Sequence, residues 1–447
     1  MIAAAVLSLV GIAGASPAQA AEATHTYYVS STGSDAADGL SSATALRTVA
    51  AASKKAFHAG DVLLLQGGAT FDGPLYLDAS DEGLEVGSWG TGRATLTGHG
   101  SSAIFGYDTA ALRIHDLNLV GDASAFTSKG GLSLYNDLSN RLSSITISNV
   151  DVQGFKNGIE LGAAKAGAGY AHVVITGARA HANRDAGIVT YGPTFNAAAP
   201  SFAHTDVRVD HTTADGNLGN ASDTTHNTGN GIVLGSVDTG TILNSRASGN
   251  GLLCKAPEGP VGIWTYDSRG IRIAYNVSSG NRTGGSADGD GFDLDQNVSS
   301  SVMENNSSGS NDGAGYLVYT GQSNSAQHDN IVRNNISTND AKKNSWYGAI
   351  TVAGHLAHTS VYGNKISTTG SASHAPAVAI KAGVSAVQVT RNSLTAATGY
   401  AVVTSPSFAR SVVAFGTNTW SSAVQRVHWG TANYGSVPAW TKATSQS

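Results

Sequence analysis

Between residues 231 and 318 the chain returns four times to a glycine followed by a short, mostly apolar segment. These segments read GIVL (231–234), GIWT (262–265), GFDL (291–294) and GYLV (315–318). The same pattern occurs outside this stretch as GLSL (131–134), GIEL (158–161), GIVT (187–190) and GAIT (348–351). Consecutive glycines are 24 to 44 residues apart, which is typical of a solenoid in which each repeat forms one coil. The pattern therefore predicts one short strand that recurs in every coil.

A second periodic feature is a set of asparagines that follow short apolar segments at intervals of 28 to 32 residues. They are Asn244, Asn276, Asn306, Asn335, Asn364 and Asn392. In stacked strands such a side-chain amide bonds the equivalent residues above and below. We therefore expect these asparagines to be structural and the strands to stack in parallel.

The composition agrees with this interpretation. Gly accounts for 55 of 447 residues and 13% of the residues are charged, whereas about 7% and about 25% are usual. A chain rich in Gly, Ser, Thr, Asn and Val favours short strands and turns over helices. The length alone would suggest about three domains, but the repeat indicates a single all-β solenoid.

Charge and cysteine content exclude several classes of function. With 26 basic and 31 acidic residues the net charge is -5, and no basic stripe is present to bind nucleic acid. The single cysteine, Cys254, can form neither an internal disulfide nor a cysteine metal site. No later apolar run reaches the ~18 residues of a membrane span. We expect a monomer that has no membrane span and does not bind nucleic acid.

Residues 1–20, MIAAAVLSLVGIAGASPAQA, form an apolar run that ends in Ala18-Gln19-Ala20. Small residues at these positions are typical of a secretory cleavage site. We expect a signal peptide over 1–20, a mature chain that begins near Ala21, and a secreted protein.

Side chains alternate along a strand, so each Gly-led segment presents one set inward and one set outward. The first and third residues after each glycine, such as Ile232 and Leu234, are the predicted core. The second and fourth residues face outward. In the central coils they are Glu160, Val189, Tyr191, Val233, Trp264, Tyr266, Asp293, Asp295, Leu317 and Tyr319.

Asp293 and Asp295 are the main catalytic candidates on this outer face. Coils lie ~4.8 Å apart and alternate residues of a strand ~6.5 to 7 Å apart. Trp264 is therefore expected beside Asp293, with Tyr266 and Tyr319 on either side of Asp295. Aromatic rings stack on sugars, and paired carboxylates near the ~6.5 Å lower edge of the inverting range supply acid and base for glycoside hydrolysis. The other predicted substrate-binding residues are Tyr191, Glu160, Asp267 and Arg269.

The string ADGDGFDLD (287–295) adds Asp288 and Asp290 to this pair. Carboxylates this close raise each other's pKa values, which leaves a protonated acid beside an ionised base. Alternatively, Asp288, Asp290, Asp293 and Asp295 bind a hard cation such as Ca²⁺. Asp288 also suits a turn. Hydrolysis itself requires no cofactor.

Motifs at both ends resemble those of secreted right-handed parallel β-helix enzymes of the pectate lyase and polygalacturonase type. They are TYYVSSTGSDAADGLSSATALRTVAAA (26–52), HAGDVLLLQGGATFDGPLYL (58–77) and VHWGTANYGSVPAWTKATSQS (427–447). The resemblance implies an N-terminal cap with first coils over 21–100, a β-helix over 101–420 and a capping segment over 421–447. There Trp429, Tyr434 and Trp440 would cover apolar surface or form a sugar-binding edge.

The resemblance implies a polysaccharide-degrading enzyme and leaves its chemistry open. Asp290-Gly291-Phe292-Asp293 is similar to a polygalacturonase strand entry, which would make Asp290 the general acid. The next coil has a single Asp312 where those enzymes have an adjacent pair. In β-helix lyases a Lys or Arg abstracts a proton from a Ca²⁺-bound uronate. The lyase candidates are Lys255, Arg269 and Arg272. A glycan-binding protein without activity is the third alternative.

Long loops over 192–204, 216–230 and 250–260 are expected to border the same groove, with His204 and His226 as further candidates. The excess of carboxylates over bases favours acid and base hydrolysis over binding of an anionic polymer. The sequence therefore predicts a secreted glycoside hydrolase that acts on a polysaccharide or oligosaccharide.

Overall fold

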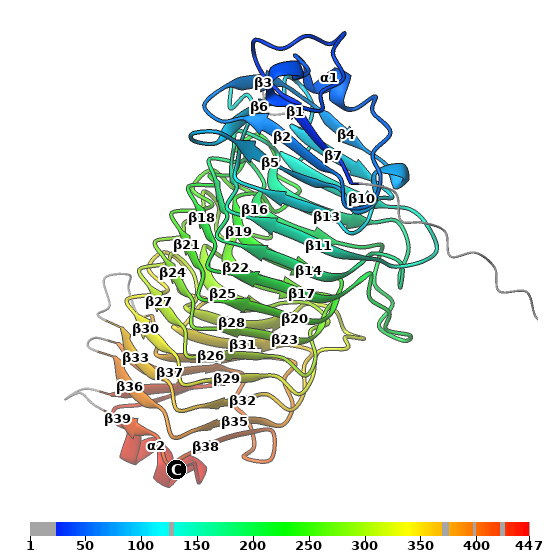
Figure 1. Ribbon diagram of the computed structural model, residues 1–447. Helices are drawn as coiled ribbons and strands as arrows, with labels where there is room; N and C mark the ends of the chain where they lie inside the picture. The colour runs from blue at the N-terminus through cyan, green and yellow to red at the C-terminus, as the bar shows by residue number, and fades with distance from the viewer. Residues whose placement is uncertain (1–23, 125–128, 369–374, 397–398, 421–424, 447) are drawn as a thin grey trace, which may run out of the picture.

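The protein is a parallel β-solenoid of about 12 turns, which Figure 1 shows as an elongated stack of coils. Each typical coil contributes one strand to each of three sheets, A, B and C. The predicted signal peptide over 1–20 lies outside the described residues. The computed structural model describes residues 24–124, 129–368, 375–396, 399–420 and 425–446.

The strands of each sheet follow one another in chain order, and the last pair of sheet C, β40 and β41, is antiparallel. Sheet A contains β1 (Thr26–Val29), β2 (Val62–Gln66), β5 (Glu85–Trp89), β8 (Arg113–His115), β11 (Leu142–Ser148), β14 (Tyr170–Thr176), β17 (His204–Asp210), β20 (Val237–Leu243), β23 (Arg269–Ala274), β26 (Val302–Glu304), β29 (Ile331–Arg333), β32 (Ser360–Tyr362), β35 (Val387–Thr390) and β38 (Val413–Gly416).

Sheet B contains β3 (Thr70–Asp72), β6 (Ala94–Thr97), β9 (Leu117–Val120), β12 (Asp151–Gln153), β15 (Arg179–His181), β18 (Thr213–Asp215), β21 (Arg246–Ser248), β24 (Val277–Ser279), β27 (Ser307–Gly309), β30 (Ile336–Thr338), β33 (Lys365–Thr368), β36 (Ser393–Ala396) and β39 (Thr419–Trp420). The helical segments are η1 (Ser42–Thr44), α1 (Val49–Ala52), η2 (Ala79–Asp81) and α2 (Val437–Thr444).

Sheet C contains β4 (Leu75–Leu77), β7 (Ile104–Tyr107), β10 (Leu132–Asn136), β13 (Asn157–Ala163), β16 (Ala186–Tyr191), β19 (Asn230–Gly235), β22 (Val261–Tyr266), β25 (Asp290–Leu294), β28 (Tyr316–Thr320), β31 (Ile350–Gly354), β34 (Val378–Lys381), β37 (Tyr400–Ser405), β40 (Arg426–Trp429) and β41 (Ala432–Tyr434).

The Gly-led segments all belong to sheet C, and their predicted inward residues form the core except in GAIT (348–351), where Ile350 pairs with Tyr316 and the register is shifted by one residue. Ile232, Ile263, Phe292 and Tyr316 pair in one continuous row through β19, β22, β25 and β28. All four are fully buried, and the Phe292 and Tyr316 rings stack with centroids 5.1 Å apart. The alternation predicted for these strands is therefore confirmed.

The asparagine ladder is also present, with one correction. The Asn306 Oδ1 accepts hydrogen bonds from the Asn276 backbone N–H at 2.9 Å and from the Asn276 Nδ2 at 3.1 Å. The same pattern continues through Asn335, Asn364, Asn392 and Asn418. The prediction for Asn244 was wrong by one residue. Ser245 donates its N–H to Asn276, whereas Asn244 adopts a left-handed φ of 49° and bonds Asp210.

A second ladder lies between sheets B and C. It was not predicted from the sequence. Its members are Asn183, Asn217, Asn250, Asn281, Asn311 and Asp340. Each member after Asn183 accepts a hydrogen bond from the backbone N–H of the member before it, and Asn183 accepts one from the Phe155 N–H. Each ladder satisfies buried polar groups at its own corner of the coils, the first between sheets A and B and the second between sheets B and C.

Figure 1 places α1 near the N-terminal end of the stack and α2 at its C-terminal end. Trp440 of α2 is fully buried, and its ring centroid lies 5.3 Å from those of Phe415 and Trp429. Tyr434 packs against the same core. A capping role for both ends agrees with these positions and stays a prediction. Among the residues described, no helix has the length and apolar character needed to cross a membrane.

Candidate active site

The register of sheet C fixes the neighbours of Asp293. Trp264 of β22 pairs with Asp293 of β25, and Asp293 pairs with Leu317 of β28. Because all three side chains leave the same face of the sheet, the carboxyl group of Asp293 lies between an indole ring and an aliphatic side chain. The predicted position of Trp264 beside Asp293 is confirmed.

Asp295 occupies the next row on the same face. The Asp295 N–H donates a hydrogen bond to the Thr265 carbonyl at 2.9 Å, which continues the register just beyond the end of β25. Asp295 therefore lies between Tyr266 and Tyr319, the residues at the equivalent position in the coils on either side. The predicted arrangement of these three side chains is confirmed.

This face is recessed and largely covered, which differs from the exposed surface that we predicted. Trp264 is only 9% exposed and Asp293 only 2%. Segments 257–259, 286–288 and 344–347 stand over the sheet and enclose a pocket of about 860 Å³. We call it the acidic pocket, because its lining includes the carboxylates Glu258, Asp267, Asp288, Asp293 and Asp295. Strand alternation alone could not predict that connecting loops would fold over the outer face.

Asp293 has the surroundings of a proton donor. Its Oδ1 is buried without a hydrogen-bond partner. Burial raises the pKa of Asp293 well above its ordinary value, and the neighbouring carboxylates Asp295, Asp290 and Asp288 add to the shift. A carboxyl group that stays neutral near pH 7 can act as a general acid.

Asp295 is more accessible than Asp293 and has a hydrogen-bond donor. Its Oδ1 accepts from the Gln296 N–H at 2.8 Å. Burial raises the pKa of Asp295 to about 8, with the Gln296 N–H acting in the opposite direction and nearby carboxylates, led by Asp288, adding to the rise. Of the two carboxyl groups, Asp295 is better placed to ionise first and act as the base. The raised pKa values were predicted from like charge, but burial is the larger cause.

Asp288 lines the acidic pocket and also joins the loops that enclose it. Its Oδ2 accepts from the Gly259 N–H at 2.7 Å, its Oδ1 accepts from the Tyr347 hydroxyl, and its own N–H donates to the Tyr347 oxygen at 2.9 Å. Asp288 has a left-handed φ of 53°, in agreement with the predicted turn. The residue thereby connects the three segments that enclose the acidic pocket.

Asp290 lies at the start of β25, beside Val261 of the pocket lining. It is fully buried, neither carboxylate oxygen has a well-formed hydrogen bond, and it is not part of the pocket lining. A Cβ placed on Gly313 would lie 1.9 Å from its Oδ1, so the Asp290 side chain packs closely against that backbone. The structure therefore gives no contact route from Asp290 to a substrate, in contrast to its predicted role as general acid.

The four carboxylates of 288–295 do not converge as a cation site. In the described part of the chain, no group of three or more His, Cys, Asp or Glu side chains is arranged to hold a metal ion. Asp288, one of the four, already has both oxygens occupied by Gly259 and Tyr347. The calcium set predicted from Asp288, Asp290, Asp293 and Asp295 therefore has no geometric support.

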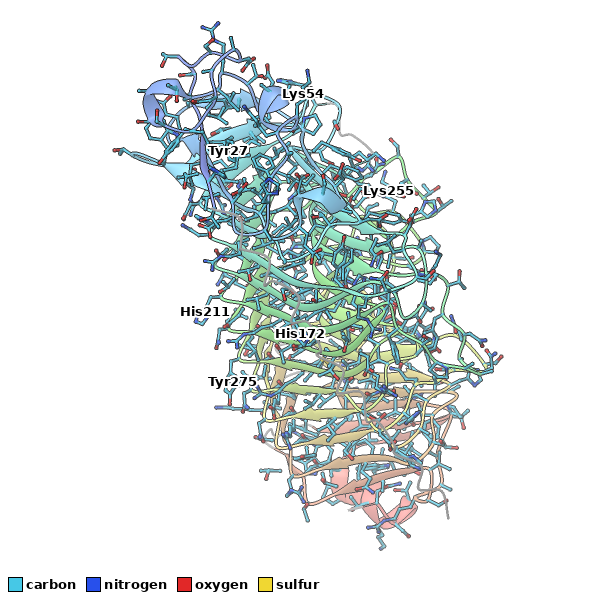
Figure 2. All side chains as sticks on the ribbon, turned by 45° about the vertical axis from the view of Figure 1, so that its right-hand side comes forward. Tyr27, Lys54, His172, His211, Lys255 and Tyr275 are labelled. Atoms are coloured by element: carbon cyan, nitrogen blue, oxygen red, sulfur yellow. The ribbon has the colours of Figure 1, made fainter. Side chains whose placement is uncertain are left out.

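Positive charge is missing from the acidic pocket. Among the described residues that line it, none is Lys, Arg or His. Lys255 is exposed and does not contribute to the lining. Figure 2 shows Lys255 on the right-hand side of the solenoid and Tyr275, which follows β23, on the left-hand side.

Arg269 and Arg272 belong to β23 of sheet A, on a different face from the site. The Arg269 guanidinium pairs with Asp238 at 2.6 Å, and that of Arg272 pairs with Glu304 at 2.6 Å. The prediction that Arg269 binds substrate was wrong, because the turn at Asp267 carries the chain from sheet C to sheet A. Asp267 itself remains at the edge of the acidic pocket.

Aromatic rings form much of the remaining lining. The Trp264 and Tyr266 ring centroids are 5.2 Å apart, and the Trp264 Nε1 donates to the Asn230 Oδ1 at 3.0 Å. Trp346 lies edge-on to Tyr319 with centroids 6.1 Å apart. Trp346 was not predicted, although the adjacent aromatics in NSWYG (344–348), directly before a Gly-led strand, were a signal available in the sequence.

Glu160 and Tyr191 lie in a neighbouring pocket of about 720 Å³, toward the N-terminal end of the same face. The Glu160 carboxylate accepts hydrogen bonds from the Ser133 Oγ at 2.6 Å and the Asn157 Nδ2 at 2.7 Å. Both residues were predicted to bind substrate. The structure separates them from that pair by several coils.

The two histidines proposed from the loops have different positions. His204 is fully buried, its Nδ1 accepts from the Tyr170 N–H at 3.1 Å, and its Nε2 lies 2.9 Å from the Tyr191 carbonyl oxygen. Burial lowers the pKa of His204 to about 4, so it is a neutral structural residue. His226 is exposed, lines the neighbouring pocket and pairs with Asp223 at 3.2 Å.

Comparisons with known proteins agree on the architecture. Residues 203–366 match the family described as the right handed beta helix region. No curated protein matches the sequence significantly.

Several solved structures have a similar fold. A GH136 lacto-N-biosidase from Eubacterium ramulus is 18% identical, with a TM-score of 0.58 over 91% of this chain and 68% of that chain. An alginate lyase from Paenibacillus sp. str. FPU-7 is 16% identical, with a TM-score of 0.48 over 77% and 96%. DFA-IIIase from Arthrobacter chlorophenolicus A6, in complex with DFA-III, is 13% identical, with a TM-score of 0.47 over 88% and 82%. The family match and the first of these structures identify the chain as a right-handed parallel β-helix.

Proposed function

We propose that the protein is a glycoside hydrolase with Asp293 as general acid and Asp295 as general base. The observation that carries the proposal is the pairing of a buried, partly unpartnered carboxyl group with a more accessible one in a pocket lined by Trp264, Tyr266 and Tyr319. Aromatic rings bind sugar faces, and carboxyl groups with different surroundings separate into acid and base. The lacto-N-biosidase of the same fold agrees with a carbohydrate substrate.

The reaction follows from this assignment. Asp293 gives its proton to the glycosidic oxygen as the bond from that oxygen to the anomeric carbon breaks. Asp295 takes a proton from a water molecule, whose oxygen forms the new bond to the anomeric carbon from the opposite face. The configuration is inverted, and proton exchange with solvent restores both groups. Alternate residues on one strand lie ~6.5 to 7 Å apart, which leaves room for that water.

The acidic pocket supports hydrolysis better than β-elimination from a uronate. A lyase must neutralise the carboxylate of its substrate, and the described lining of the acidic pocket contains carboxylates and no Lys, Arg or His. Hydrolysis through Asp293 and Asp295 needs no resident cofactor, so we expect chelators to leave the rate unchanged. We also propose that the protein acts outside the cell, on the basis of the signal-like residues 1–20.

The test is a product analysis over neutral and uronate-containing glycans with the wild type and Asp295→Asn. We expect new reducing ends without unsaturated ends, and loss of cleavage in the variant with an unchanged fold by circular dichroism. Unsaturated ends would show a lyase, whereas binding without any new ends would show a glycan-binding protein. Full activity of Asp295→Asn would refute the assignment of the base.

A further inference from the structure

The pocket that contains Tyr191 and Glu160 adjoins the acidic pocket. Asn227, Trp264 and Tyr266 line both cavities. The second cavity, of about 720 Å³, has Tyr135, Tyr191 and Tyr266 in its lining, and we call it the tyrosine pocket. The two pockets follow each other along sheet C in the direction in which the coils stack, and we call the pair the depression. The proposed hydrolysis uses only one end of it.

One row of sheet C alternates tyrosine with glycine along this depression. The row runs through Tyr135, Gly162, Tyr191, Gly235, Tyr266, Asp295 and Tyr319. A Cβ on Gly162 would lie 2.3 Å from the Tyr191 Cζ, and a Cβ on Gly235 would lie 2.3 Å from the Tyr266 Cζ. Each of these two rings therefore leans across the coil before it, where only glycine leaves room. Because they lean in this way, the Tyr191 and Tyr266 rings lie along the floor of the depression. We call such rings platforms, because a sugar can stack on them.

The spacing of these rings suits a chain of sugars. From Tyr135 to Tyr319 a tyrosine occurs in every second coil, and the coils are ~4.8 Å apart. One pyranose residue spans roughly one coil, so rings two coils apart meet alternate sugars of an extended chain. Asp295 occupies the coil between the last two platforms, Tyr266 and Tyr319. The chain would thus be held on both sides of the bond that is cleaved.

The charges along the depression favour an uncharged chain. The lining of the tyrosine pocket contains three cations, Lys129, Lys156 and Arg184, and three carboxylates, Glu160, Asp185 and Asp223. Arg184 pairs with Asp185 at 2.6 Å, and His226 pairs with Asp223 at 3.2 Å. These polar groups, with Glu160 on the floor, offer hydrogen bonds to hydroxyl groups without a net positive field. The carboxylates of the acidic pocket would repel an anionic polymer.

We propose that the tyrosine pocket is a set of distal sugar subsites, and that the substrate is a neutral glycan of several residues that lies along the solenoid axis. Tyr191 stacks on a sugar remote from the cleaved bond, Tyr266 stacks on a sugar next to that bond, and Gly162 and Gly235 set the tilt of the two rings. This inference rests on the proposed function and adds to it a chain-length requirement. A substrate that fills only the acidic pocket does not use Tyr191.

The experiment compares Tyr191→Ala with the wild type on the neutral oligosaccharide series that the wild type cleaves, from disaccharide to octasaccharide. We expect kcat/KM to fall about tenfold for the longest members and to stay unchanged for the shortest member cleaved. Gly162→Ala, which keeps the Tyr191 ring but displaces it, should show the same dependence on length. Tyr275→Ala removes an exposed ring outside both pockets and should match the wild type on every substrate.

The possible results separate this inference from the proposed function. If the wild type cleaves a neutral series but Tyr191→Ala and Gly162→Ala affect all lengths equally or none, the tyrosine pocket is not a distal subsite. If the wild type cleaves only anionic glycans, the inference is wrong about the substrate while hydrolysis can still hold. If the wild type cleaves no glycan, the proposed function fails and this inference fails with it.

Discussion

Asp340 and Asp293 are both 2% exposed and lie two coils apart, but their carboxyl groups differ in hydrogen bonding. Asp340 ends the second ladder and accepts hydrogen bonds from the Asn311 N–H at 3.0 Å, the Asn311 Nδ2 at 2.8 Å and the Ser337 Oγ at 2.6 Å. Asp293 has a buried oxygen without any partner. Buried polar groups are normally satisfied, so the unsatisfied one requires an explanation.

The pKa directions express the same difference. Burial raises the pKa of Asp340 to about 6, and its hydrogen bonds limit the rise. Burial raises the pKa of Asp293 further, and the adjacent carboxylates reinforce it. A buried carboxyl group with its donors in place supports the fold, whereas one without them, at the floor of a pocket, is poised for proton transfer. The unsatisfied carboxyl group of Asp293 therefore lowers the stability of the fold, whereas the hydrogen-bonded carboxyl group of Asp340 does not.

The largest expected effect is on catalysis. Asp293→Asn keeps the shape of the side chain and removes its proton for donation, so kcat should fall about a thousandfold. Assays on the cleaved glycan, with circular dichroism as the control for folding, measure the effect. A rate within tenfold of the wild type would refute the assignment of Asp293 as the general acid.

The second effect is on stability and concerns the ladder. Asp340→Ala leaves the donors of Asn311 and Ser337 without their acceptor, and the free energy of unfolding should fall by about 3 kcal/mol. Asp340→Asn copies the residue found at the other ladder positions and should restore stability, since Ser337 can then accept as Ser308 does from Asn311. Urea unfolding measures both. Either variant should cleave glycan at the wild-type rate per folded molecule. A loss of activity in Asp340→Asn would contradict the claim that Asp340 is structural and Asp293 catalytic.

These contrasts also show what the sequence could predict. The glycine period, the inward row through Ile232 and Phe292, and the placement of Trp264 beside Asp293 depend on alternation within strands and on stacking between coils. Both are local rules that the sequence displays. Asn244 was misplaced because two asparagine-bearing positions are adjacent in the turn and only one points to the ladder.

The covering of the site could not be predicted in the same way. The bond between Asp288 and Tyr347 joins residues 59 positions apart through loops of irregular length, and no periodicity describes such loops. Arg269 was misplaced because a turn of a few residues separates sheet C from sheet A. The tilt of Tyr191 over Gly162 depends on side-chain conformation, although the alternation of Tyr and Gly in that row was visible once the register was known.

The third effect is the dependence of activity on pH. The base Asp295 must be ionised, and its pKa is raised from 3.8 to about 8. We therefore expect kcat/KM to fall about tenfold for each pH unit below about 8. The alkaline decline should report ionisation of Asp293. Full activity down to pH 5 would mean that the general base has an ordinary Asp pKa. The base would then not be Asp295 in the acidic pocket.

The smallest effect is on the pH dependence of stability. Because the pKa of Asp295 is higher in the folded protein than in the unfolded chain, the folded state binds more protons between about pH 4 and pH 8. Its contribution to stability is therefore lost as pH rises through that window. Asp295→Asn should remove this loss, so its Tm should exceed that of the wild type at pH 9 by more than at pH 4. An equal difference at both pH values would contradict the raised pKa.

The most direct test of the central claim is a crystal structure of Asp295→Asn with an intact oligosaccharide from the cleaved series. We predict that the glycosidic oxygen to be cleaved lies within hydrogen-bond distance of the Asp293 carboxyl group, with sugars on the Tyr266 and Tyr319 rings. An oligosaccharide bound with its cleavable bond away from Asp293, or on another face of the solenoid, would contradict the account.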